Sequence, residues 1–127
     1  MKYYDLKVGG IIVAVAPVMH AYRATKVNGV EVKDVLAVEL VGDDGDSIAM
    51  LTVNLPEAFA TLDFPKNASF INVNKCPWAI DFIKANDLGT ITDWTWPSGF
   101  CTYPMCYFNT DKLNLYQPTI YDMGVEE

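Results

Sequence analysis

Four residues of this chain are suited to nucleophilic or metal-binding chemistry: His20, the only histidine, and the three cysteines, Cys76, Cys101 and Cys106. A thiol nucleophile needs a neighbouring base to remove its proton, so such an enzyme would have to bring His20 beside a cysteine. No serine lies in a Gly-x-Ser-x-Gly turn, and Gly9-Gly10 is too short for a phosphate-binding loop. A small enzyme using His20 or a cysteine is therefore the third of three functional hypotheses.

Two groups of residues are the candidates for a metal site. Cys101 and Cys106 are five positions apart, so their side chains face opposite ways on a regular strand, whereas zinc sites combine close cysteine pairs with further ligands. Asp43, Asp44 and Asp46 offer oxygen ligands for a cation such as calcium, but their spacing differs from that of an EF-hand loop. Aspartate is also favoured in exposed hairpin turns. We expect a turn there, three free cysteines, and neither a metal nor a cofactor.

The charge of the chain is negative and unevenly distributed. The 127 residues carry a formal net charge of −7. Residues 1–42 contain five cationic side chains and four carboxylates, and residues 43–127 contain four lysines and twelve carboxylates. An acidic surface repels phosphate backbones, so a nucleic-acid partner is not expected, whereas a basic protein surface would be attracted. The plainer explanation is that the charge keeps the protein soluble.

Length and composition predict one globular domain with its own core, because 51% of the residues are hydrophobic. The apolar run 8–19 follows two lysines, as in a short signal peptide. However, Asp5 lies in the would-be basic segment, and Pro17 and His20 leave no small-residue cleavage site. The run is too short to span a membrane, and three cysteines do not make a disulfide framework. These features predict a cytoplasmic protein without membrane contact.

Strand signals dominate the front of the chain. Asn28-Gly29 is a hairpin turn signal, since both residues tolerate positive φ. Pro17 cannot donate to a ladder and indicates an edge strand or a bulge. β-Branched and apolar segments predict strands over 11–15, 18–24, 26–27, 30–32, 35–41, 47–55, 69–73 and 102–109.

One helix is expected, over residues 77–86. Pro77 suits a first helical turn, Trp78 and Phe82 belong to an apolar stripe at helical spacing, and Gly89 fits a stop signal. Together the elements predict an α+β fold, an antiparallel meander with one main helix packed on one face. The domain is expected to cover residues 1–113, and residues 114–127 to form a partly loose tail.

The segment 94–104 is the most unusual part of the sequence, because four aromatic residues, two prolines and a glycine share eleven positions. Trp94 and Trp96 are two apart and would share one face of an extended segment. Tryptophan is favoured at the centre of protein interfaces, but the pair would serve equally well to cap the open end of a sheet. The candidate partner-binding residues are Trp94, Trp96, Asp93, Asp43, Asp44 and Asp46.

Two motifs in this order resemble the pattern of a small uncharacterised bacterial family. Leu51-Thr-Val-Asn-Leu-Pro56 is similar to its T-V-N-L-P motif, and Ser98-Gly-Phe-Cys-Thr-Tyr-Pro104 to its S-G-F-x-x-Y-P motif, with a polar turn and a short helix between them. The resemblance covers roughly residues 35–113. It departs from the family after Asn74, where Lys75 and Cys76 replace a simpler polar turn. The resemblance implies an origin on conjugative elements, plasmids or phages, and it assigns no activity.

Three functions follow from these observations. The first is a non-enzymatic acidic binding protein of a mobile element, such as an anti-restriction or anti-CRISPR inhibitor of host defence, that occupies a basic protein surface. The second is a structural accessory or oligomerising module of the conjugation machinery. The third is the small enzyme named above.

Overall fold

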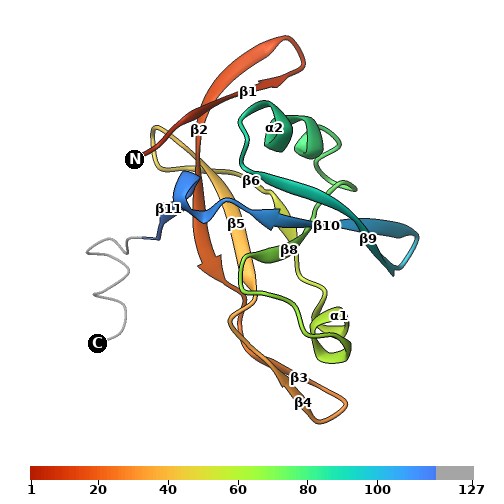
Figure 1. Cartoon of the computed structure of the whole chain (residues 1–127). Coiled ribbons are helices and arrows are strands. Elements are labelled where there is room, and N and C mark those ends of the chain that lie inside the picture. The colour runs from red at the N-terminus through yellow and green to blue at the C-terminus, as the bar shows by residue number, and fades with distance from the viewer. Residues whose placement is uncertain (117–127) are drawn as a thin grey trace, which may run out of the picture.

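The computed structural model describes residues 1–116, and strands predominate in them: 51% of these residues lie in strands and 14% in helices. The strands form a five-stranded sheet, a four-stranded sheet and a separate two-stranded hairpin (Figure 1). Within this part of the chain, no helix has the length and apolar character needed to cross a bilayer. The helical segments are α1 (Pro56–Thr61), α2 (Ala79–Ala85) and the 3-10 turn η1 (Thr110–Lys112).

The first sheet is built around its long second strand. Along one edge, the first half of this strand pairs with the antiparallel β1 and the second half with the parallel β11, while its other edge pairs with the antiparallel β5. β5 in turn pairs with β6 across a register shift. The members of the sheet are β1 (Tyr4–Val8), β2 (Ile11–Ala21), β5 (Leu36–Gly42), β6 (Ser47–Met50) and β11 (Asn114–Leu115).

The second sheet is antiparallel throughout and has the order β7-β8-β10-β9. Its strands run across those of the first sheet in Figure 1. They are β7 (Thr52–Val53), β8 (Ala68–Ile71), β9 (Gly89–Ser98) and β10 (Cys101–Phe108). The separate hairpin consists of β3 (Thr25–Val27) and β4 (Val30–Val32). Its turn confirms the Asn-Gly prediction, with φ of 51° at Asn28 and 82° at Gly29.

The predicted α+β fold, a meander with one main helix on one face, is wrong. The structure is mostly β, and α2 is the only helix of seven residues in the described part of the chain. Three strands escaped prediction, namely β1, the ten-residue β9 and the short β11. The single strand expected over 47–55 is divided between the two sheets at Leu51. The helix itself lies inside its expected range, but Asp87, with φ of 52°, makes the left-handed turn after it, and Gly89 begins β9.

Two buried clusters hold these layers together. The larger one lies between the sheets and α2, and combines Val15 and Leu40 from the first sheet with Phe108 from the second and Ile83 from α2. Its members are almost completely removed from water, which is the main favourable contribution to folding. The smaller cluster lies beneath α1 and contains Leu55, Ala58, Ala68, Phe70, Tyr103 and Met105.

The chain passes from one sheet to the other at Leu51 and Thr52. The N–H of Leu51 donates to the carbonyl of Val38 in the first sheet (2.8 Å), but the Leu51 carbonyl accepts from Asn72 beside the second sheet (3.0 Å). In a regular antiparallel ladder, Val38 would donate its N–H to that same carbonyl. Instead, the Thr52 hydroxyl accepts the Val38 N–H (3.1 Å) and bonds the Tyr22 hydroxyl (2.7 Å). A side chain thus replaces the missing ladder partner.

A second side chain completes the first sheet opposite Pro17. This proline is in the interior strand β2, at the gap between the parts that pair with β1 and β11, so its missing N–H leaves no bond unmade. Its carbonyl accepts from the Asn114 side-chain amide (3.0 Å), which also bonds the backbone N–H and C=O of Lys2 (2.7 and 2.9 Å). Asn114, at the start of the expected tail, therefore joins β11 to β2 and to the segment that precedes β1. Residues 117–127 of that tail lie outside the described residues.

Replacing Thr52 by valine tests the junction between the sheets. The change keeps the shape of the side chain but leaves the buried Val38 N–H without an acceptor, so we expect a loss of about 1–3 kcal/mol in the free energy of unfolding. Thr52→Ser retains the hydroxyl and serves as the control, because it loses only a methyl group, about 1 kcal/mol. Urea unfolding measures both. A valine variant as stable as the wild type would contradict the role of the hydroxyl.

Candidate functional site

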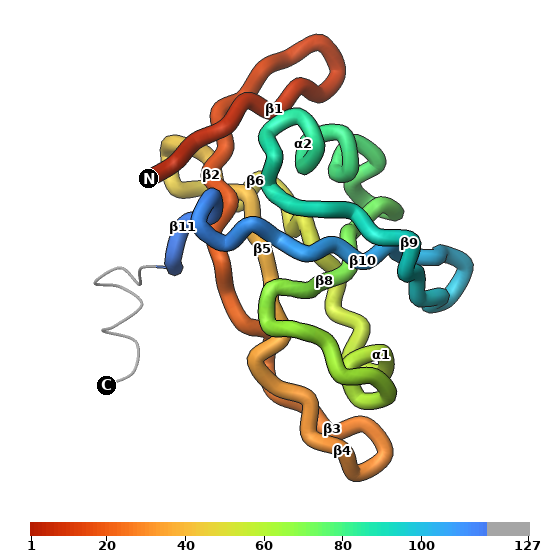
Figure 2. Tube along the Cα trace, in the orientation of Figure 1, coloured from red at the N-terminus to blue at the C-terminus, as the bar shows by residue number. Residues whose placement is uncertain are grey.

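The β9–β10 hairpin presents the most exposed aromatic side chain of the described residues. Ser98 pairs with Cys101, so Gly99 and Phe100 form a two-residue turn. Gly99 has φ of 61°, a conformation that favours glycine at this position of a tight hairpin. The Phe100 side chain is fully exposed, with a relative accessibility of 113%. The hairpin tip stands away from the sheets (Figure 2).

The two tryptophans of β9 differ in burial. Trp96 is half-buried, pairs with Tyr103 of β10 and packs against the smaller core cluster. Trp94 is 50% exposed and, among residues 1–116, its one aromatic neighbour is Phe64, whose ring lies edge to face at 6.1 Å between centroids. Trp96 thus serves the core, while Trp94 leaves half of its surface available.

The acidic residues expected to act with the tryptophans are in two different places. Asp93 is exposed beside Trp94 on β9. Asp43, Asp44 and Asp46 occupy the turn between β5 and β6, which lies on the opposite side of the molecule from the β9–β10 tip in Figure 1. The Asp44 carboxylate accepts the backbone N–H of Asp46 (3.0 Å), as expected for a turn. In residues 1–116, no three histidine, cysteine or acidic side chains are arranged to hold a metal ion.

His20 lies in a polar environment formed by a carboxylate and an aromatic ring. Its Nε2 lies 3.0 Å from Glu39 Oε1 on the neighbouring strand β5, and its ring lies 4.6 Å from that of Tyr116. The side chains of His20 and Glu39 are about one quarter exposed. This arrangement fixes the ring between β5 and the end of the described chain.

The cysteines are free, and two of them are buried. Burial raises the pKa of Cys106 from 9.0 to about 12. Burial also raises the pKa of Cys76, although nearby Lys75 opposes the shift, and its thiol donates to the Met50 carbonyl (3.6 Å). Because the thiolate is the nucleophilic form, both thiols are poorly suited to covalent catalysis at neutral pH.

Phe100 is the surface residue that sequence reasoning missed. The sequence singles out Trp94, Trp96 and Asp93 in this segment, whereas the structure places Phe100 in the turn between β9 and β10. The sequence feature that could have indicated this exposure is the two-residue turn formed by Gly99 and Phe100. A side chain in such a turn projects away from both strands, so a large aromatic residue has nothing of its own chain to pack against.

The matched family model is described as a domain of unknown function, DUF4313, and it covers residues 25–126. The chain therefore belongs to this family, and the resemblance to an uncharacterised family is confirmed at that level. The match begins after β2, so the β1–β2 hairpin lies outside it. Comparison with curated proteins and with solved structures found no significant match.

The burial of two thiols predicts selective modification. At pH 8 we expect Cys101, which is partly exposed, to react with a chromogenic disulfide reagent at least about 100-fold faster than Cys76 and Cys106. All three should react together in denaturant. Mass spectrometry of the partly modified protein identifies the fast thiol, and rapid native labelling of Cys106 would contradict its burial.

The raised pKa of Cys106 also predicts a loss of stability in alkali. Above pH 9 the unfolded chain ionises this thiol, whereas the folded chain keeps it protonated up to about pH 12. The unfolded state therefore binds fewer protons in this range, and the free energy of unfolding falls as the pH rises. Cys106→Ala removes this contribution but keeps that of Tyr22, whose pKa is also raised by burial. We expect the wild type to lose more stability than the variant between pH 8.5 and 10.5 in urea titrations, and equal losses would contradict the assignment.

Proposed function

We propose that this protein is a non-enzymatic binding protein that engages another protein through the tip of its β9–β10 hairpin. The observation that carries the proposal is the full exposure of Phe100 in a rigid two-residue turn. Burying a phenylalanine side chain in a partner contributes about 1.5–3 kcal/mol. The hairpin loses little freedom on binding, because its base is anchored in the core through Tyr103 and Met105.

Trp94 extends the same surface along the hairpin. It lies four residues before Ser98, the last residue of the strand, which places it roughly 15–20 Å from the tip at the usual rise of a strand. A partner surface of ordinary size covers both aromatic residues. Exposed aromatic anchors of this kind are typical of the residues that dominate binding energy.

The charge around the anchors indicates the chemistry of the partner. Asp93 is the only charged residue between Gly89 and Phe108, and Asp63 adjoins Phe64, the ring that Trp94 contacts. An apolar centre with an acidic border is complementary to an apolar pocket with a basic border. The net charge of −7 favours the same kind of partner at longer range. Two points stay predictions: that this partner belongs to a host-defence system, and that the protein acts in the cytoplasm.

Matched variants test the hairpin as the contact surface. Tagged full-length protein is used to capture partners from a lysate of the source cell, and quantitative mass spectrometry compares the variants. We expect Phe100→Ser and Asp93→Lys to reduce capture of a specific protein, with Phe100→Ser weakening its affinity at least about thirtyfold, or ~2 kcal/mol. Raising the salt concentration should weaken the wild-type complex as well.

Two controls make the same chemical changes elsewhere. Val30→Ser removes an apolar side chain that is 47% exposed on the β3–β4 hairpin, and Asp43→Lys reverses a charge in the β5–β6 turn. Both should leave capture intact. The proposal is wrong if Phe100→Ser and Asp93→Lys bind normally, or if Asp43→Lys alone abolishes binding. Light scattering of each variant reports whether self-association accounts for a change.

A further inference from the structure

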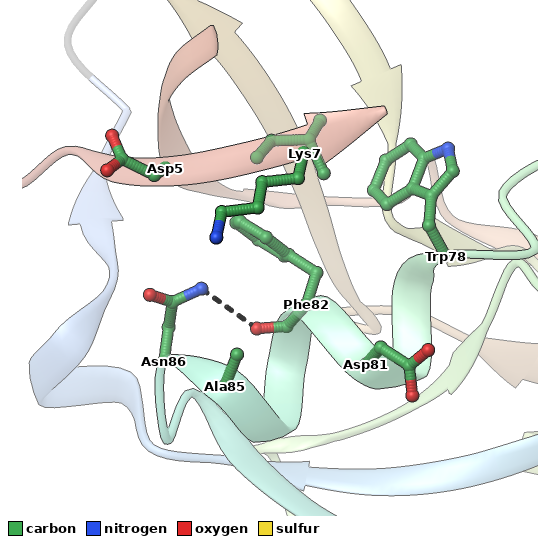
Figure 3. Close-up of a pocket in the computed structure, with 8 residues that line it drawn as sticks. Asp5, Lys7, Trp78, Asp81, Phe82, Ala85 and Asn86 are labelled. Carbon is green, nitrogen blue, oxygen red and sulfur yellow. Dashed lines mark hydrogen bonds between the residues drawn. The ribbon is translucent and has the colours of Figure 1, made fainter. Parts of the chain in front are cut away.

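A groove of about 430 Å³ lies between β1 and α2 (Figure 3), and none of the residues that line it belongs to the β9–β10 hairpin. On one side it is lined by three consecutive residues of β1, namely Asp5, Leu6 and Lys7. Successive side chains of a strand point to opposite faces of the sheet. A groove that touches all three therefore lies along the edge of the strand, where the backbone itself is accessible.

That edge of β1 is unpaired. β1 lies at one end of the order β1-β2-β5-β6, and within residues 1–116 it pairs only with β2. An edge strand presents alternate N–H and C=O groups that another extended chain can bond. Lipids and nucleic acids do not offer a matching row of donors and acceptors. The backbone of β1 thus specifies an extended polypeptide as the complementary ligand.

The opposite wall of the groove is one face of α2 and its flanking residues. Trp78, Asp81, Phe82, Ala85 and Asn86 follow the spacing of a single helical stripe. Trp78 and Phe82 form its apolar floor, with their rings edge to face at 6.2 Å between centroids. A segment lying along β1 would direct every second side chain onto this floor.

Lys7 gives the groove a specific charge preference. Its side chain extends over Phe82 toward Asn86, while the carboxylates of Asp5 and Asp81 point away from it (Figure 3). No ion pair or hydrogen bond of the Lys7 amine with another described residue is present. A carboxylate carried by the ligand would pair with this amine, and cationic groups would suit the two aspartates at the rim.

We propose that the β1–α2 groove binds an extended segment of another protein by strand addition. The segment adds to the edge of β1, places an apolar side chain on the Trp78–Phe82 floor, and pairs a carboxylate with Lys7. The apolar surface continues beyond the groove, because Val8 and Ile11 lie on the Leu6 side of the hairpin and are 42% and 65% exposed. The site is independent of the hairpin tip and takes a different kind of ligand, an extended chain instead of a folded surface.

Synthetic octapeptides with alternating valine and polar residues test this site on the full-length protein. The central polar residue is glutamate, lysine or glutamine, and each peptide is made with a free and an amidated C-terminus, so that a terminal carboxylate is distinguished from a side-chain carboxylate. By fluorescence anisotropy we expect a carboxylate-bearing peptide to bind at least tenfold more tightly than its lysine counterpart. Methylation of alternate peptide amides in one of the two registers should abolish binding, because it removes the bonds to β1.

Two variants and one control locate the binding. Lys7→Glu should reverse the preference so that lysine peptides bind better, and Ala85→Trp, which fills the groove from an exposed helix position, should weaken all peptides at least tenfold. Lys26→Glu makes the same charge change on the exposed β3–β4 hairpin and should have no effect. Circular dichroism confirms that each variant is folded.

Three results would overturn the proposal. The first is binding that does not depend on the central charge or on the two groove variants. The second is the absence of any peptide binding up to about 1 mM, a range that includes weak strand-addition complexes. The third is that Ala85→Trp instead disrupts self-association of the protein, or its binding to phosphatidylcholine–phosphatidylserine vesicles, which would assign the groove to a second copy or to a membrane.

Discussion

The arrangement of the second sheet against the first depends on the change of sheet at Leu51 and Thr52. Leu51 directs its N–H to one sheet and its carbonyl to the other, and the Thr52 hydroxyl satisfies the Val38 N–H that this change would leave unpaired. Ser69 makes a similar connection, since its hydroxyl donates to the Leu36 carbonyl (2.7 Å). Both hydroxyls are buried, where an unpaired backbone group is costly. Two side chains on β7 and β8 therefore fix the second sheet against the first, and with it the direction of the β9–β10 hairpin.

The amino-acid sequence indicates local features well and the division into sheets poorly. Asn28-Gly29 and the helix near Trp78 depend on neighbours in sequence, and both are present. The change of sheet at Leu51 depends on Val38 and Asn72, which are distant in the chain, so 47–55 has the pattern of one continuous strand. Gly89 illustrates the same limit. It resembles a helix stop, yet a Cβ there would lie 2.6 Å from Cys106 Sγ, so the glycine allows β9 to approach β10.

The residues of the candidate surface could be predicted only in part, because their exposure also depends on residues that are distant in the chain. Trp94 and Trp96 are indistinguishable by spacing, and their different burial follows from which rings of other elements reach them: Trp94 contacts Phe64, while Trp96 pairs with Tyr103. Asp93 and the three aspartates of the β5–β6 turn contribute alike to the acidic charge of the sequence, but they belong to different sheets. Charge counts describe long-range attraction, whereas a contact surface requires the arrangement in space.

The strand edges of the two sheets differ in how well they are protected, and this difference separates the two proposed binding modes. β9 is a long edge strand, but it contains Pro97, which lacks an N–H, and its pairing with β10 has a register shift. β6 has four residues beside a register shift, and β7 has only two. β1 carries the charges of Asp5 and Lys7, but it contains neither proline nor a register shift in its five residues, and its last residue, Val8, is exposed together with Ile11. Strand addition is therefore least hindered at β1. β9 is suited to display side chains at its tip, because its edge pairs poorly with a further strand.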